Sequence, residues 1–220
     1  MAYGYSLLTL RWEADVDHIA PTVAAYDVLA PDYAERWFGL HLGKPLARFQ
    51  AHVPQGSWVL DAGCGPGRDA QSLQALGYRV LGFDRSVGML SEGRQRGVSV
   101  PLALADLRRL PLPVRSLGGI WACASLLHLP KAGLRVALTE FARVLDSGHL
   151  YLVLKEGEGE GWQTEGRTGL HRYLARYQLS ELVSLLEGSG FQVLERWLDP
   201  PGKGQRHRWI SVIATVRALR

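Results

Sequence analysis

Three glycines and two acidic residues are the groups in this 220-residue chain whose types and spacing are best suited to ligand chemistry. Gly63, Gly65 and Gly67 alternate with other residues just after Asp61, and Asp84 ends the next apolar run. Glycine reaches positive φ at little cost and has no Cβ, so a ligand can lie against this turn. An acid at the end of the second strand can accept hydrogen bonds from both hydroxyls of a ribose. These residues predict a nucleotide-type cofactor site.

The elements needed to position these groups are a strand, a turn, a helix start and a second strand, which is half of a Rossmann unit. The dinucleotide fingerprint is G-x-G-x-x-G/A. Here Arg68 stands at the third small position, and the third glycine falls one residue earlier, at Gly67. The spacing therefore makes a dehydrogenase the least favoured of the functions considered.

The pattern from Asp61 to Gly67 resembles the first motif, D/E-x-G-x-G-x-G, of the class I S-adenosylmethionine-dependent methyltransferases. Residues 80–86, followed by Met89, resemble the second motif of this family, and residues 103–107 resemble the third. Residues 120–125 and 141–150 resemble the fourth strand and the helix, turn and fifth strand. The resemblance covers roughly residues 55–216.

The resemblance implies S-adenosylmethionine as cofactor and S-adenosylhomocysteine as product. It implies that Asp84 holds the ribose, that Met89 covers the adenine, that Asp106 accepts from the adenine amino group and that the amide of Leu107 contacts the ring. The full set of expected cofactor-binding residues is Tyr33, Asp61, Gly63, Gly65, Asp84, Arg85, Met89, Asp106, Leu107 and Ala124.

Two features depart from the family pattern. The turn before the fifth strand usually reads Pro-Gly-Gly, whereas here it is Ser147-Gly148-His149, and we expect Gly148 to make the turn. An acceptor-binding signature of the Asn-Pro-Pro-Tyr type does not follow the fourth strand. The methyl acceptor is therefore left open.

Length and composition indicate one compact α/β domain. The apolar content of 47% supports a substantial core. No apolar run is long enough to cross a bilayer, and the N-terminus has no basic start with a cleavage site, so we expect a cytoplasmic protein. The two cysteines form no C-x-x-C pair and should line the cleft, and the seven histidines lack metal-ligand spacing, so no metal site is expected.

The expected fold is a Rossmann-like α/β fold with a mostly parallel seven-stranded sheet and helices on both faces. Residues 1–53 are expected to form an N-terminal lid of short helices, with Pro21 and Pro31 at helix starts. Residues 54–220 are expected to form the methyltransferase domain. Its first five strands are expected near residues 57–61, 79–84, 98–104, 117–124 and 149–155, and its helices near 67–77, 86–96 and 131–145.

The last third of the chain should complete the sheet. Residues 156–161 alternate acid and glycine, which favours a flexible loop at the mouth of the cleft. A helix over residues 179–187 and strands over 191–197 and 209–216 follow. In the family these two strands form an antiparallel hairpin, which gives the strand order 3-2-1-4-5-7-6.

Acceptor-side chemistry has a few candidates. His128 follows the fourth strand, and histidine titrates near neutral pH, so it is the candidate general base, with pocket lining as the alternative. Further acceptor contacts could come from Lys155, Glu156, His171, Arg172 and Tyr173. Arg172 with Lys155 would suit a carboxylate or phosphate.

We interpret the chain as a methyltransferase that acts on a small molecule. A tRNA or RNA methyltransferase is an alternative, because the net charge is +4 and the pI is about 9.2, although the basic residues are dispersed. A third alternative is a cofactor-binding subunit without turnover. The sequence leaves the acceptor, the attacked atom and the oligomeric state open.

Overall fold

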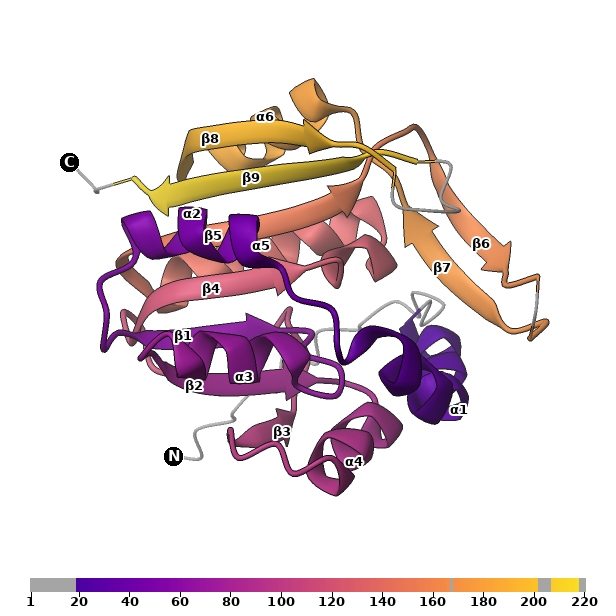
Figure 1. The fold of residues 1–220 in the computed structure, drawn as a ribbon. Helices are drawn as coiled ribbons and strands as arrows, with labels where there is room; N and C mark the ends of the chain where they lie inside the picture. The colour runs from indigo at the N-terminus through magenta and orange to yellow at the C-terminus, as the bar shows by residue number, and fades with distance from the viewer. Residues whose placement is uncertain (1–18, 167, 202–206, 218–220) are drawn as a thin grey trace, which may run out of the picture.

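A computed structural model describes residues 19–166, 168–201 and 207–217 (Figure 1). Its centre is a seven-stranded sheet in the order β3-β2-β1-β4-β5-β9-β8. The strands of this sheet are β1 (Trp58–Ala62), β2 (Arg79–Asp84), β3 (Leu102–Leu104), β4 (Leu117–Cys123), β5 (Leu145–Lys155), β8 (Phe191–Asp199) and β9 (Trp209–Val216).

The topology confirms the predicted sheet. The first five strands are parallel, and β9 pairs antiparallel with both β5 and β8. A separate two-stranded hairpin, β6 (Glu160–Thr164) with β7 (His171–Ala175), lies between β5 and β8 in the chain. When this hairpin is left out of the count, the order is the predicted 3-2-1-4-5-7-6.

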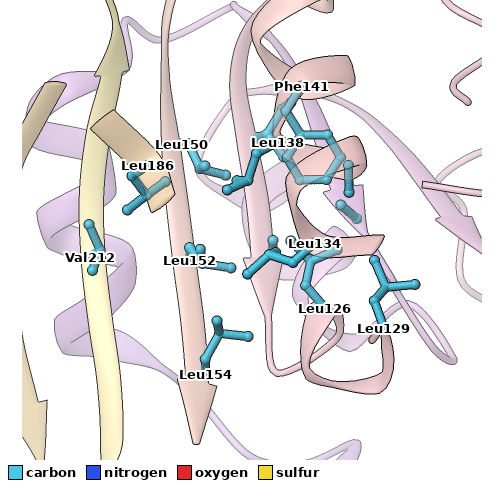
Figure 2. Close-up of a cluster of buried hydrophobic side chains, with 14 of the residues drawn as sticks. Leu126, Leu129, Leu134, Leu138, Phe141, Leu150, Leu152, Leu154, Leu186 and Val212 are labelled. Atoms are coloured by element: carbon cyan, nitrogen blue, oxygen red, sulfur yellow. The ribbon is translucent and has the colours of Figure 1, made fainter. Parts of the chain in front are cut away.

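Both faces of the sheet are buried because alternate residues of the central strands enter two different cores. Leu150, Leu152 and Leu154 of β5 pack into one core, whereas Tyr151 and Val153 pack into the other. Figure 2 shows the first core, where leucines of β5 face Leu134, Leu138 and Phe141 of a helix.

Each face of the sheet is covered by its own set of helices. Helices α5 (Lys131–Val144) and α6 (Leu179–Gly188) belong to the core in Figure 2, and α2 (Gly43–His52) and α3 (Arg68–Ala75) cover the other face. The carboxyl ends of the parallel strands share one edge of the sheet. Helix α1 (Ile19–Trp37) and the hairpin β6–β7 lie beyond that edge, with α1 beside α4 (Val87–Gln95) (Figure 1). Ligands bind at such an edge in open α/β sheets.

The prediction that Pro31 begins a helix was wrong. Pro31 lies inside α1, which is one continuous helix of 19 residues rather than two short ones. A proline in a helix interior removes one backbone hydrogen bond, to the carbonyl of Asp27. Burial of Ala25, Leu29, Ala30 and Ala34 along the same helix offsets that loss. The first 18 residues of the predicted lid lie outside the described residues.

Three other local predictions need correction. Residues 160 and 161, expected in a flexible loop, belong to β6, because β7 supplies their backbone partners. The third strand is shorter than predicted and begins at Leu102. The fifth strand begins at Leu145, directly after α5, rather than near residue 149, so Gly148 does not make a turn before it, and Ser147, with φ of 50°, lies inside β5. Gly148 is needed for a different reason: a Cβ there would lie 2.5 Å from the carbonyl oxygen of Gly118 on β4.

No helix in the described part of the chain is long and apolar enough to cross a membrane.

Candidate active site

The glycine turn after β1 has the backbone conformation that its sequence requires. Gly63, Gly65 and Gly67 have φ values of 76°, 53° and 83°. A Cβ on Gly63 would lie 2.2 Å from Cβ of Ser125, so the turn approaches the loop after β4 closely. A Cβ on Gly65 would meet nothing nearer than 4.0 Å, where Met89 Sδ and Tyr33 Cε1 lie. Gly65 therefore leaves bare backbone facing open space.

Asp84 fixes the second strand end to this turn. Its Oδ2 accepts from the amide of Gly65 at 2.8 Å, and its Oδ1 accepts from the amide of Ser86 at 2.9 Å. Burial raises the pKa of Asp84, although these backbone hydrogen bonds oppose that shift. Each carboxylate oxygen has two lone pairs, so one on each remains for a ligand hydroxyl.

Asp106, after β3, is held by arginines. Its Oδ1 accepts from the amide of Arg108 at 2.9 Å, and its Oδ2 accepts from Nη2 of Arg108 at 2.8 Å. Burial alone would raise the pKa of Asp106, but the hydrogen bonds and charge of Arg108, with a smaller effect of Arg85, lower it overall. Nη1 of Arg85 lies 3.3 Å from Oδ2 of Asp106 without the geometry of a hydrogen bond, and it is buried. The N–H groups of this Nη1 are therefore available to donate a hydrogen bond to a ligand.

A cavity that we call the turn cavity gathers these groups at the carboxyl edge of the sheet. Ten of the eleven residues predicted from the sequence line it: Tyr33, Gly63, Gly65, Asp84, Arg85, Met89, Asp106, Leu107, Ala124 and His128. Asp61 is the exception. It lies at the base of the turn in a smaller adjoining cavity.

Asp61 forms a buried acidic pair with Asp69, the second residue of α3. Burial raises the pKa of Asp61 well above its usual range, and the charge of Asp69 raises it further. Asp69 is the better compensated of the two: it accepts from Nε of Arg68 at 2.6 Å and from Nε1 of Trp121 at 2.9 Å. Oδ2 of Asp61 is buried without a hydrogen-bond partner. The sequence did not reveal Asp69 or this pairing.

A second, larger cavity of about 610 Å³, which we call the outer cavity, adjoins the first. Five residues are common to the two linings, and we call them the shared wall: Tyr26, Tyr33, Cys123, Ala124 and His128. Ala124 has φ of 54°, a left-handed conformation that costs a non-glycine residue about 1 to 2 kcal/mol. Strained backbone of this kind is typical of ligand sites.

His128 is half-buried in the shared wall, with its ring between two oxygen atoms. Its Nδ1 lies 2.9 Å from the carbonyl oxygen of Tyr173, which can only accept, so Nδ1 carries the proton. Nε2 then accepts from the hydroxyl of Tyr26 at 2.7 Å, and Nη1 of Arg172 donates to that hydroxyl at 3.0 Å. Burial lowers the pKa of His128 to about 4, with Arg172 and Lys155 adding to the shift against the Tyr173 hydrogen bond. His128 is therefore neutral at pH 7.

The remaining predicted acceptor contacts separate into two groups. Lys155 and Arg172 line the outer cavity. Glu156 is engaged by Arg208 at 2.6 Å, and His171 is exposed and contacts Thr164. Tyr173 is buried, with its ring against Trp162. Tyr26 lies within the predicted lid, residues 1–53, but is not among the predicted site residues; its partner His128 is 102 positions away, so no local pattern could show the contact.

Cys123 lines both the turn cavity and the outer cavity. Cys64 lines the small third cavity that also contains Asp61. Burial raises the pKa of each thiol well above its usual range, so both are protonated. Across the residues that the structure describes, no group of three or more His, Cys, Asp or Glu side chains is arranged to hold a metal ion.

The turn cavity suits S-adenosylmethionine chemically. The bare backbone at Gly65 gives room for a ligand chain, and Asp84 keeps lone pairs for two ribose hydroxyls. Met89 and Leu107 supply apolar surface for a planar ring. The buried Nη1 of Arg85 has no hydrogen-bond partner and could donate to a ring nitrogen.

Comparison with known proteins gives the same family. A family model described as "Methyltransferase domain" matches residues 59–148. The malonyl-[acyl-carrier protein] O-methyltransferase of Yersinia pestis is 37% identical over 124 residues, which are 53% of this chain and 45% of the relative. The demethylmenaquinone methyltransferase of Symbiobacterium thermophilum is 32% identical over 119 residues, which are 48% of this chain and 45% of the relative. The chain thus spans about half the length of these relatives.

Solved structures agree on the fold. The 1,6-didemethyltoxoflavin-N1-methyltransferase of Burkholderia thailandensis, solved with 1,6-didemethyltoxoflavin and S-adenosylhomocysteine bound, has a TM-score of 0.73 and 20% sequence identity. The match covers 90% of this chain and 88% of that one. At 20% identity this likeness shows the fold, and the family rests on the family model and the sequence relatives, which identify residues 59–148 as a class I S-adenosylmethionine-dependent methyltransferase domain.

Proposed function

We propose that this chain binds S-adenosylmethionine in the turn cavity and transfers its methyl group to a small-molecule acceptor in the outer cavity. The observation that carries the proposal is the shared wall. The turn cavity, whose lining suits an adenosine group, and the outer cavity of about 610 Å³ meet at Tyr26, Cys123, Ala124 and His128. A volume of this size is in the range of sites for small organic ligands.

When bound, S-adenosylmethionine supplies a methyl group already activated by a positively charged sulfur. The task left to the protein is to align the acceptor with the methyl group and to keep water out. The shared wall suits both tasks, because the rings of Tyr26, Tyr33 and His128 pack edge to face at 5.0 to 6.0 Å. We assign α1, which carries both tyrosines, the role of the lid over the site.

The general-base role predicted for His128 remains a prediction, and the geometry favours a different role. Its Nε2 already accepts a hydrogen bond from the hydroxyl of Tyr26, and a pKa of about 4 makes the imidazole a weak base at pH 7. We propose that His128 is a positioning residue that holds the Tyr26 hydroxyl toward the acceptor. The hydroxyl oxygen, which donates its hydrogen to His128 and accepts from Nη1 of Arg172, is then the polar group that the acceptor meets.

The two alternatives are less well supported. RNA binding would call for a stripe of free cations, but Arg68, Arg108, Arg143 and Arg208 are each hydrogen-bonded to a carboxylate. Among the basic residues near the C-terminus, Lys203 and Arg206 lie outside the described residues, whereas His207 and Arg208 lie within them. A subunit without turnover would have no use for a large second cavity beside the cofactor site.

Calorimetric titration with S-adenosylhomocysteine tests the cofactor assignment. We expect saturable binding of one molecule per chain, and Asp84→Asn should weaken it about tenfold or more, because hydrogen bonds to a charged group contribute about 1.5 to 3 kcal/mol. Asp146→Asn, at an exposed site, is the matched control and should bind like the wild type. Equal affinities of the Asp84→Asn variant and the wild type would remove Asp84 from the site.

A further inference from the structure

Four cationic side chains line the outer cavity: Arg36 and Arg68 are paired with Asp32 and Asp69, whereas the charges of the other two, Lys155 and Arg172, act on each other. Lys155 ends β5, and Arg172 lies in β7. Burial lowers the pKa of Lys155, and the positive charges of Arg172 and Arg176 lower it further. Both Lys155 and Arg172 also lower the pKa of His128 in the shared wall. The two cations therefore act on the same region of the cavity.

The anionic side chains around this cavity do not neutralise the pair. Within the described ranges, Lys155 has no carboxylate at ion-pair distance, and its ammonium lies 5.6 Å from the centre of the Trp209 ring. Arg172 has one distant acidic partner, Glu165, at 3.9 Å, and its Nε is buried without a hydrogen-bond partner. The other acids of the lining are engaged elsewhere: Asp32 with Arg36 and Asp199 with Ser211.

Two like charges held in a half-buried wall are unfavourable unless an anion lies between them. We infer that the acceptor carries an anionic group, a carboxylate or a phosphate, that Lys155 and Arg172 bind together. The rest of the lining is largely apolar, so the body of the acceptor is aliphatic or aromatic and packs against Leu29, Leu127, Val153, Leu174 and Trp209.

This inference rests on the proposed function, since it describes the ligand of the acceptor cavity. Its recognition chemistry follows from the side chains themselves. A guanidinium binds a carboxylate or phosphate through two parallel hydrogen bonds, and an ammonium adds a compact charge. Arg172 also donates to the Tyr26 hydroxyl, which places the anion site next to the shared wall.

Binding of simple probes to the protein saturated with S-adenosylhomocysteine tests the inference. Sodium octanoate and 1-octanol have similar bodies and differ in charge, so calorimetry can compare their dissociation constants directly. We expect octanoate to bind at least tenfold more tightly than octanol. Arg172→Met and Lys155→Met should each weaken octanoate at least fivefold and leave octanol unchanged. Octyl phosphate in place of octanoate distinguishes the two anions.

Two control variants separate a local anion site from general attraction by a basic protein. Glu165→Gln removes the acid beside Arg172, so octanoate should bind equally well or more tightly. Arg135→Met removes an exposed cation of α5 and should have no effect.

Two results would overturn the inference. The first is octanoate that binds no more tightly than octanol, which includes no binding of either up to about 10 mM. The second is octanoate binding that both Arg172→Met and Lys155→Met retain. Failure of S-adenosylhomocysteine to bind the wild type would instead overturn the proposed function.

Discussion

Individual carboxylates organise the backbone of this site by accepting hydrogen bonds from amides and a hydroxyl. Asp84 and Asp106 each accept from the amide two residues further along, and Asp27 of α1 accepts from the amide of Gly88 and from the hydroxyl of Ser86. The types and positions of Asp84 and Asp106 could be predicted from the sequence, because they follow apolar strands. Asp27 could not, since its partners are 59 and 61 positions away.

The lowered pKa of His128 should make the free energy of unfolding depend on pH. Its pKa is about 4 in the folded protein against an ordinary value of 6.5, so between these values the unfolded chain binds the extra proton. Stability should therefore rise with pH through this window and fall on acidification below pH 6.5, by up to about 3 kcal/mol for this group.

Chemical denaturation at pH 7 and pH 4.5 measures this effect. The pKa of His149 is also lowered by burial, so the comparison is between the wild type and His128→Asn. The variant should lose less free energy of unfolding on acidification than the wild type does. Parallel losses in the two proteins would contradict a neutral His128.

At the scale of elements, α1, the proposed lid, packs closely against α4. A Cβ on Gly88 would lie 2.7 Å from the carbonyl oxygen of Asp27 and 2.8 Å from its Cα. The clash is with backbone on both sides, so neither helix can relieve it by turning a side chain. The carbonyl concerned is also the one whose helical hydrogen bond Pro31 removes.

Gly88→Ala should therefore separate α1 from α4. We expect a loss of about 1 to 3 kcal/mol in the free energy of unfolding and weaker binding of S-adenosylhomocysteine. The matched control is Gly133→Ala in α5, where the nearest atom would lie 3.5 Å away and alanine should stabilise the helix by up to about 1 kcal/mol. Thermal or denaturant unfolding of both variants checks this. A Gly88→Ala protein as stable as Gly133→Ala would show that the contact does not hold the lid.

The sheet was predictable from local pattern, whereas the additions to its edge were not. Its central strands β1, β4 and β5 are buried on both faces, so each appears in the sequence as a short apolar run. Strand β6 alternates exposed and half-buried residues, begins in an acid and glycine segment and is defined only by its pairing with β7. A continuous α1 through Pro31 is likewise decided by packing, which local sequence does not contain.

At the scale of the whole molecule, the position of the site follows from the strand order. The chain moves outward from β1 to β2 and β3, then returns to add β4 on the other side of β1. The strand order therefore reverses between β1 and β4, and ligands of open α/β sheets bind outside the carboxyl ends of the strands at such a point. The turn at Gly63 and the loop at Ser125 meet at this point, joined by a hydrogen bond of 2.6 Å from Ser125 Oγ to the carbonyl oxygen of Ala62.

A crystal structure of the complex with S-adenosylhomocysteine tests the central claim most directly, because it locates the sulfur relative to both cavities. We predict the ribose on Asp84, the adenine between Met89 and Leu107, and the sulfur at the shared wall beside Tyr26, Ala124 and His128, facing the outer cavity. A ligand bound outside the turn cavity, or a sulfur that faces away from the outer cavity, would contradict the account.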